Sequence, residues 1–365
     1  MTEQLEIIPM RGIGDITPGS DLAGTIAAAA PWLRDGDVLV VTSKIVSKAE
    51  GQLVDVPVSG PEREAAREET LTAETARLVA RRGHTQIVQT HHGFVMASAG
   101  VDASNVERSK LVLLPKDPDA SARELRSALR ERFGLNVAVI VSDTMGRPWR
   151  TGLTDVALGA AGIEPIRDHR GETDAYGNEL HITQMAVIDE LSAAAELVKG
   201  KRDQVPVAVV RGYLPSGPGL DDGPGAAALI RDSQHDLFSL GTAEARAAGL
   251  AAAAGLSEPV AFGDGPVDAA VIARAMSAVA AAPDTLLVLT ETSAPADLPS
   301  NTAFVVACGV TEPEDPHRLV ALGADVHRLR CALAAEDLLT IWLPIPRPGR
   351  IGLLAVGPPD TITEP

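Results

Sequence analysis

The chain has 365 residues, a formal net charge of −17 at pH 7 and only 3% aromatic residues. This acidic balance repels the phosphates of nucleic acids, and few aromatic rings are present on which bases could stack, so we expect no nucleic-acid partner. An apolar fraction of 45% fits a globular protein with a large core, and the length indicates at least two domains.

Neither the first residues of the chain nor its cysteines indicate an exported or membrane protein. Residues 1–6 carry acids where a signal peptide carries basic residues, and no apolar run reaches the roughly 20 residues of a membrane span. We therefore expect a cytoplasmic protein with no membrane partner. Cys308 and Cys331 lack the paired spacing of a thiolate zinc site, and one disulfide would not suit a reducing compartment.

Hydrophobic periodicity and turn residues predict both strands and helices in residues 1–242. Strands are expected at 5–9, 37–43, from 94 onward, 111–115, 137–141 and 205–210, and helices at 20–33, 61–82, 119–133 and 182–199. We expect His91 and His92 in a turn, because adjacent strand residues face opposite sides of a sheet and do not suit one metal ion. Asp189 and Glu190 are expected on the solvent-exposed face of their helix.

The composition changes near residue 240, where residues 243–257 are rich in alanine and glycine. We expect this segment to link two domains, residues 1–242 and 258–365. In the second domain, helices are expected at 267–281 and 317–339, and strands at 286–289, 302–309 and 351–357.

A group of polar residues follows the apolar strand at 137–141. We expect this strand to end at Asp143 and Thr144, with a turn at 146–148. An acid beside a hydroxyl, followed by glycine and arginine, suits a site that holds a divalent cation next to phosphate. The alternative is that Asp143 only caps the next segment.

Two other predicted strands also lead into polar loops. Asp102 follows one of them, and Lys44 and Lys48 follow the strand at 37–43. Carboxylates from two strand ends, Asp102 and Asp143, can bridge one or two magnesium or manganese ions, which prefer oxygen ligands. The lysines are placed to contact a phosphate chain, although lysines near strand ends are more often solvated.

Four short segments combine these loops with their strands: VTSKIVSKAEG (41–51), AGVDASNVE (99–107), VSDTMGR (141–147) and VVRG (209–212). In this order they resemble the coenzyme F420-0:L-glutamate ligase family, the last segment more weakly than the others. The four segments together are far more specific than any one of them. The resemblance covers residues 5 to about 240 and favours the metal role of Asp143 over the cap.

The resemblance implies an α+β fold whose mixed sheet belongs to an intertwined homodimer with clefts between the subunits. It implies that GTP drives the addition of L-glutamate, and of further γ-linked glutamates, to coenzyme F420-0 through an acyl phosphate. Two divalent cations, Mg²⁺ or Mn²⁺, are implied as cofactors, and K⁺ is compatible with the family. The positions that match the family are the metal ligands Asp102, Asp143 and Thr144 and the nucleotide contacts Ile13, Gly14, Asp15, Ile16, Ser43, Lys48 and Asn105.

Three basic residues receive a role from their position alone. Lys44, Arg147 and Arg150 lie in or next to the matching segments. They are candidates for stabilising charge on the transferring phosphoryl group or for holding glutamate.

The second domain resembles the last third of a flavin-dependent nitroreductase-like domain, which is fused to the ligase domain in actinobacterial relatives. The similar segments are 321–335, 339–342 and 352–357. The domain is short, and the arginine-rich segment expected to hold the flavin phosphate is absent after Leu256, so FMN is not expected. We expect a shortened remnant that packs on the ligase or aids dimerisation. The alternative functions are a flavin reductase that acts through this domain and a non-catalytic nucleotide-binding scaffold.

Overall fold

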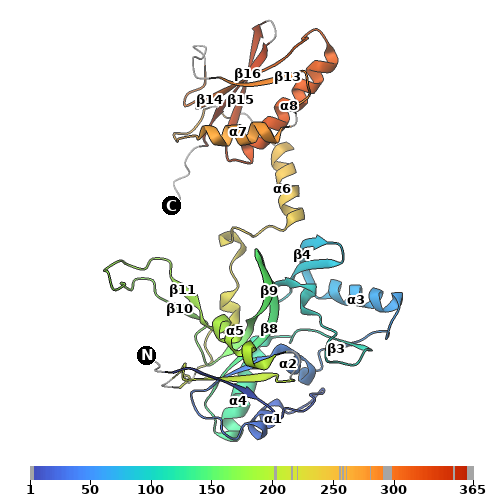
Figure 1. Cartoon of the computed structure of the whole chain (residues 1–365), viewed down its shortest axis with the longest axis vertical. Coiled ribbons are helices and arrows are strands. Elements are labelled where there is room, and N and C mark those ends of the chain that lie inside the picture. The colour runs from blue at the N-terminus through green and yellow to red at the C-terminus, as the bar shows by residue number, and fades with distance from the viewer. Residues whose placement is uncertain are drawn as a thin grey trace. The chain divides into compact units, whose positions relative to one another are not determined.

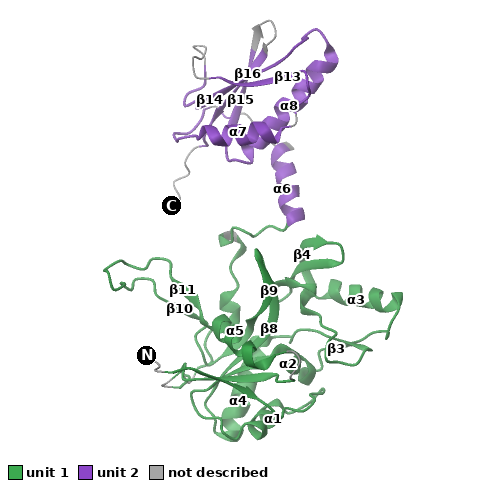
Figure 2. Cartoon of the chain, in the orientation of Figure 1, with its two compact units in different colours: residues 1–241 green, residues 242–365 purple. Residues whose placement is uncertain are grey.

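The computed structural model consists of two compact units, Met1–Gly241 and Thr242–Pro365 (Figures 1 and 2). We call them unit 1 and unit 2. The structure describes residues 4–200, 204–214, 217–219, 221–254, 256, 259, 261–279, 281–290, 298–347 and 350–359. Among these residues, no helix combines the length and the apolar character that a membrane crossing requires.

Unit 1 is built on a five-stranded mixed sheet. In spatial order its strands are β1 (Glu6–Met10), β12 (Val207–Arg211), β2 (Val38–Thr42), β8 (Ala138–Arg147) and β9 (Arg150–Ala161). The central pair, β2 and β8, is parallel, and every other neighbouring pair is antiparallel. The expected α+β class with a mixed sheet is therefore confirmed.

Helices cover both faces of this sheet because its central strands are apolar on both sides. Leu39 and Val41 pack with α1 (Leu22–Ala29), α2 (Ser43–Glu50) and α4 (Pro118–Phe133). Val38 and Val40 alternate with them and pack against α5 (Val187–Lys199) on the other face. The sheet is therefore buried between two layers of helices. Any functional polar residues must lie at the ends of its strands.

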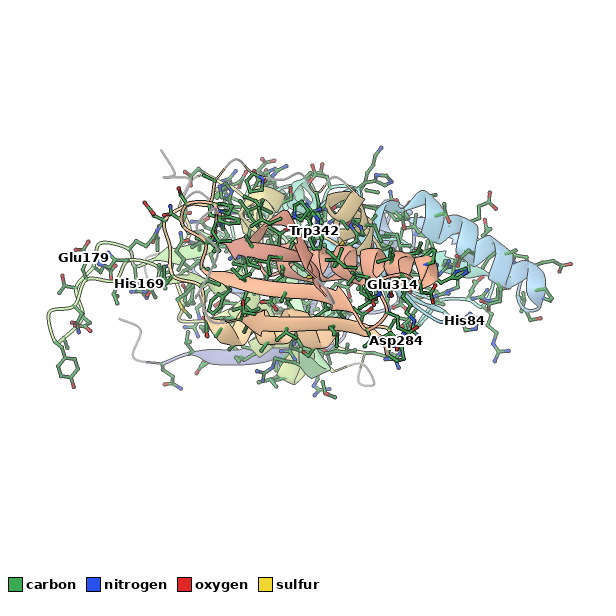
Figure 3. The ribbon with its side chains drawn as sticks, turned by 90° about the horizontal axis from the view of Figure 1, so that it is seen from above. His84, His169, Glu179, Asp284, Glu314 and Trp342 are labelled. Carbon is green, nitrogen blue, oxygen red and sulfur yellow. The ribbon has the colours of Figure 1, made fainter. Side chains whose placement is uncertain are left out.

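Smaller elements surround the sheet. They are the pair β3 (Leu53–Asp55) and β7 (Lys110–Val112), α3 (Pro61–Ala73), the sheet β4 (Thr75–Arg82), β5 (Thr85–Thr90) and β6 (Val95–Ala97), the pair β10 (Ile166–Asp168) and β11 (Gln184–Ala186), and the 3-10 turns Ser98–Gly100, Ala226–Leu229 and Ser233–His235. Figure 3 shows His169 and Glu179 on the loop between β10 and β11, which projects from unit 1.

Unit 2 is an antiparallel four-stranded sheet with α7 (Ala269–Ala278) and α8 (Pro316–Ala334) packed on one face. Its strands, in spatial order, are β13 (Thr285–Thr290), β14 (Phe304–Val310), β16 (Arg350–Gly357) and β15 (Leu339–Arg347), and α6 (Thr242–Ala254) precedes α7 in the chain. Ile272 of α7 and Leu329 of α8 are fully buried against Val306 and Leu354 of the sheet. The segment expected to be a linker thus contains a helix, α6, because an alanine-rich sequence has high helix propensity.

Two predictions about unit 1 elements were wrong. The segment after β2 was expected to be a loop but forms α2, in which Ile45 and Val46 are buried and Gly51 ends the helix in the left-handed conformation. Residues 61–82 were expected to form one helix, but α3 ends at Ala73 and β4 begins at Thr75. The pairing of β4 with β5, a contact outside the segment itself, decides this conformation.

The prediction that a strand ends at Asp143 was also wrong, and with it the interpretation of Asp143 as a cap. Strand β8 continues to Arg147 and turns at Trp149, with a φ of 62°, into β9. The parallel pairing with β2, however, stops at the pair Thr42 and Ser142. Asp143 therefore lies at the end of the parallel pair, although it is inside a strand. The predicted turn at His91 and His92 is confirmed.

The close approach of α4 to β9 depends on Gly159. A methyl group at this position would lie 2.1 Å from the carbonyl oxygen of Pro118. We expect Gly159→Ala to lower the free energy of unfolding by about 3 kcal/mol, measured by urea denaturation, because the helix must move away from the sheet. Gly146→Ala in the same hairpin is the control, since its nearest atom would be 3.9 Å away. Equal stability of the two variants would show that α4 adjusts freely.

Candidate active site

The candidate site lies where β2 and β8 end their parallel pairing. Helix α2 begins with Ser43 directly after β2, so its first turn lies next to Asp143 of β8. The Thr42 side chain makes no capping hydrogen bond in the described chain. The amides of the first turn of α2 are therefore available to an anion, and the helix dipole favours negative charge there.

Asp102 reaches this place through the β3 and β7 pair. It forms an isolated bridge with Val112, in which each residue donates its amide to the other's carbonyl. Its carboxylate lies 2.6 Å from the Lys44 amine, and the Lys44 amine also donates to the Ser104 hydroxyl at 2.7 Å. Burial raises the pKa of Asp102, but hydrogen bonds from Lys44 and Ser104 outweigh it and lower the pKa below its ordinary value. Asp102 is therefore an ionised carboxylate at neutral pH.

Asp143 has a different environment from Asp102. Burial raises its pKa to about 6, and the negative charges of Asp155 and Asp102 act in the same direction. Hydrogen bonds from the Thr144 amide, at 2.7 Å, and from the Ser43 hydroxyl oppose this shift. The protein's own charges therefore do little to stabilise the ionised form of Asp143, and a bound cation would stabilise it strongly.

A buried network lies behind Asp143. Asp155 of β9 accepts hydrogen bonds from the Thr144 hydroxyl at 2.8 Å and the Ser142 hydroxyl at 3.0 Å. The amine of Lys199, in the last turn of α5, lies 2.8 Å from both Asp155 and Ser142. Sequence reasoning missed both Asp155 and Lys199. The sequence does contain a signal for Asp155, because it is an acid within a run of small, apolar residues in β9. A charge buried in such a strand requires a partner.

The residues predicted to contact nucleotide lie around α2. Lys48 is one helical turn from Lys44, so both amines lie on one face of α2, and Lys48 pairs with Asp15 at 3.1 Å. Ile13 and Ile16 are buried in the core and anchor the exposed Gly14 and Asp15 between them. Asn105 has a φ of 56° in the loop that carries Asp102 and Ser104. Ser43 is buried beside Asp143.

Two of the predicted basic residues lie apart from this cluster. Arg147 and Arg150 face each other across the exposed tip of the hairpin that β8 and β9 form. At about 3.3 Å per residue, Arg147 is about 13 Å along the strand from Asp143. The expectation that Asp189 is simply solvated was also wrong, because Asp189 accepts a hydrogen bond from the Ala157 amide at 2.8 Å and burial raises its pKa.

The donor atoms of the cluster fit a hard cation. Within the residues that the structure describes, no group of three or more His, Cys, Asp or Glu is placed to hold a metal ion. Asp102, Asp143 and Thr144 offer two carboxylates and a hydroxyl, all of them oxygen ligands. Mg²⁺ and Mn²⁺ accept such incomplete sets, because water and substrate phosphates supply the remaining ligands. The residues therefore fit such an ion when it enters with phosphate.

Solved nitroreductases cover part of the chain. A putative NADH dehydrogenase/NAD(P)H nitroreductase from Parabacteroides distasonis is 15% identical, covers 32% of this chain and 90% of its own, and has a TM-score of 0.26. A mutant form of the FMN- and NADPH-dependent nitroreductase NfnB from a sphigopyxis species is 13% identical, with 31% and 88% covered and a TM-score of 0.26. These identities and TM-scores are too low to establish a shared fold, so the nitroreductase resemblance of unit 2 stays a prediction.

Unit 1 has much closer relatives. The coenzyme F420:L-glutamate ligase of Methanothermobacter thermautotrophicus is 41% identical over 251 residues, which are 64% of this chain and 98% of the relative. The enzyme of the same name from Methanopyrus kandleri is 40% identical over 249 residues, 65% and 98% of the two chains. The family model of F420-0:gamma-glutamyl ligase matches residues 12–212. The chain therefore belongs to the F420-0:gamma-glutamyl ligase family.

Proposed function

We propose that unit 1 joins L-glutamate to the carboxylate of coenzyme F420-0 at the expense of GTP, with one or more γ-linked glutamates added. The observation that carries this proposal is the meeting of Lys44, Asp102 and Asp143 at the first turn of α2, with Thr144 directly after Asp143. Such a cluster combines positive charge, free amides and oxygen ligands, which is what a phosphoryl-transfer site requires. The names of the relatives support the choice of coenzyme and amino acid.

The reaction needs two steps because a carboxylate is a poor electrophile. In the first, a carboxylate oxygen of F420-0 attacks the γ-phosphorus of GTP, the bond to the β-phosphate oxygen breaks, and GDP leaves. The product is an acyl phosphate. In the second, the glutamate amine attacks the acyl carbon, phosphate leaves with the bonding electrons, and the amine loses a proton as the amide forms.

The chain's own residues bring the reacting anions together. Lys44 and Lys48 present positive charge on one face of α2. The amides of its first turn, which the Thr42 side chain does not cap in the described chain, add hydrogen-bond donors for phosphate oxygens. Asp102, Asp143 and Thr144 would hold Mg²⁺ or Mn²⁺, which neutralises phosphate charge when bound. Buried hydrophobic residues anchor the loop at Ile13 and Ile16, so its backbone is fixed beside the nucleotide.

We also propose that the protein acts as a homodimer. The hairpin of β8 and β9 carries a Trp149 side chain that is 91% exposed and a Leu153 side chain that is 63% exposed. A second copy would cover these apolar groups. The same hairpin carries Arg147 and Arg150, so we assign these two arginines to the cleft between subunits, where they would hold an anionic substrate.

Incubation of the protein with GTP, Mn²⁺, L-glutamate and F420-0 tests the function. We expect mass spectrometry to show F420-0 heavier by one or more glutamyl residues, with GDP and phosphate released in equal amounts. Lys44→Ala should lower kcat/KM by about 100-fold, because it removes charge stabilisation at the transferring group. Lys110→Ala is the matched control. Lys110 also forms an ion pair with an aspartate, Asp55, but this ion pair joins β7 to β3 and lies outside the cluster. GTP binding without glutamate addition would favour the scaffold function instead.

A further inference from the structure

The structure holds a buried ion pair that the proposed reaction does not use directly. Lys199 and Asp155 lie 2.8 Å apart, and each side chain is only 2% exposed. Burying two charges is costly, and an apolar pair of similar volume often stabilises a protein more. A contribution to stability is therefore a weak explanation for this ion pair. The other hydrogen bonds of Asp155 and Lys199 indicate a second explanation.

The pair is connected to the candidate site through hydroxyl groups. Oδ2 of Asp155 accepts from the Lys199 amine and the Ser142 hydroxyl, while Oδ1 accepts from the Thr144 hydroxyl at 2.8 Å. Strand register fixes this contact, because Thr144 and Asp155 are direct partners across β8 and β9. Both oxygens of Asp155 are thus engaged, one toward Lys199 and the other toward the site.

These hydrogen bonds decide which way the Thr144 hydroxyl points. A hydroxyl has one proton and two lone pairs, and only a lone pair can bind a cation. An ionised carboxylate only accepts hydrogen bonds, so the Thr144 proton must point at Asp155. The lone pairs of Thr144 are then directed away from Asp155. Lys199, which only donates, holds Asp155 in place and offsets its charge.

We propose that Asp155, held by Lys199, is a positioning residue that turns the lone pairs of Thr144 toward the divalent cation. This inference rests on the proposed function, since it gives Thr144 the role of a metal ligand. It adds a supporting pair to that site, of the kind whose loss typically costs about 10 to 100-fold in metal affinity.

Asp155→Asn reverses the hydrogen bond with little change in shape. Lys199 and Ser142 both donate toward Oδ2 of Asp155, so the asparagine oxygen will take that side and its NH₂ group will face Thr144. The Thr144 hydroxyl must then accept, and its proton turns toward the cation. We expect the Kd for Mn²⁺, measured on the full chain with GDP present by the EPR signal of free Mn²⁺, to rise about 10 to 100-fold.

Two further variants make the test decisive. Thr144→Val removes the hydroxyl without touching the ion pair and should weaken Mn²⁺ binding by a similar factor, whereas Thr144→Ser should retain it. Adding Asp155→Asn to Thr144→Val should not lower the Mn²⁺ affinity further, because both changes act on the same hydroxyl group. Asp189→Asn is the matched control, since Asp189 accepts from the amide of Ala157 on the same strand and does not bond Thr144 in the described chain.

The outcomes separate the inference from the proposed function. Unchanged Mn²⁺ affinity in Asp155→Asn or in Thr144→Val would overturn the inference while leaving the ligase function intact. A wild-type protein that ligates glutamate but binds no Mn²⁺ with GDP would also overturn it. Absence of both ligation and Mn²⁺ binding in the wild type would instead overturn the proposed function. Thermal unfolding of each metal-free variant shows whether it is folded. If Asp155→Asn is not, the double variant Asp155→Leu with Lys199→Met replaces it, because it also removes the acceptor of the Thr144 proton and should weaken Mn²⁺ binding about 10 to 100-fold.

Discussion

Asp143→Asn should make the metal-free protein more stable at pH 7.5 and at the same time abolish glutamate ligation. Burial raises the pKa of Asp143 from 3.8 to about 6, so the folded protein binds this proton more tightly than the unfolded chain does. The resulting stabilisation is complete below about pH 4 and is lost as the pH rises through about 6. At pH 7.5 the wild-type protein therefore holds a carboxylate at a cost that asparagine avoids.

The expected gain in the free energy of unfolding is about 1 to 3 kcal/mol at pH 7.5. The upper figure follows from the rise of the pKa to about 6, which already includes the opposing hydrogen bonds from the Thr144 amide and the Ser43 hydroxyl. The lower figure applies if asparagine replaces these two hydrogen bonds incompletely. Urea denaturation in the presence of a chelator measures the gain, which should fall to roughly half at pH 5 because the wild-type group is then mostly protonated.

Ligation should be lost in the same variant because asparagine offers no negative charge to the cation. Asp21→Asn is a control of opposite sign. The Asp21 side chain is 51% exposed, and the hydrogen bond from Arg132 lowers its pKa to about 2, so its charge stabilises the folded state above about pH 4. That variant should lose stability at pH 7.5 and keep its activity. Metal-dependent ligation by Asp143→Asn would remove Asp143 from the metal site.

The parts of the site that sequence predicted are those with a local signal. An apolar run that stops at a polar residue indicated Lys44, Asp102 and Asp143 before any contact was known. At Asp143 this change marks the end of the parallel pairing with β2, because β8 itself continues to Arg147. Their meeting follows from the parallel pairing of β2 with β8 and from the bridge of Asp102 to Val112. No single segment of the sequence predicts this pairing. The family resemblance nevertheless implied that Asp102 and Asp143 lie together in one metal site.

The parts that sequence missed depend on distant partners. Asp155 lies among small apolar residues, and its partner Lys199 is 44 positions further along the chain. Neither residue belongs to a motif, so only the packing of α5 on the sheet reveals the pair. Arg147 and Arg150 show the opposite case, in which closeness in sequence does not bring residues together within one subunit. They are close to Asp143 in sequence, but an extended strand carries each residue about 3.3 Å further from it.

Lys199→Met should destabilise unit 1 strongly without altering the backbone. It removes the only amine bonded to Asp155 in the described part of the chain and leaves a buried carboxylate with two hydroxyl donors. Breaking a buried pair in this way costs about 3 to 5 kcal/mol. Urea denaturation of the metal-free protein measures the loss, and Lys110→Met, which breaks the exposed pair with Asp55, should change stability little because solvent screens that pair.

The double variant Lys199→Met with Asp155→Leu separates stability from positioning. Removing both charges should recover part of the loss and leave the protein about 1 to 3 kcal/mol below wild type, because the buried Ser142 hydroxyl then lacks its acceptor. The Mn²⁺ affinity of the double variant should be about 10 to 100-fold below that of the wild type, since no acceptor orients the Thr144 hydroxyl. If affinity instead returned together with stability, the ion pair would serve only to hold α5 on the sheet. Stability without affinity would show that these two buried charges are retained for what they do to Thr144.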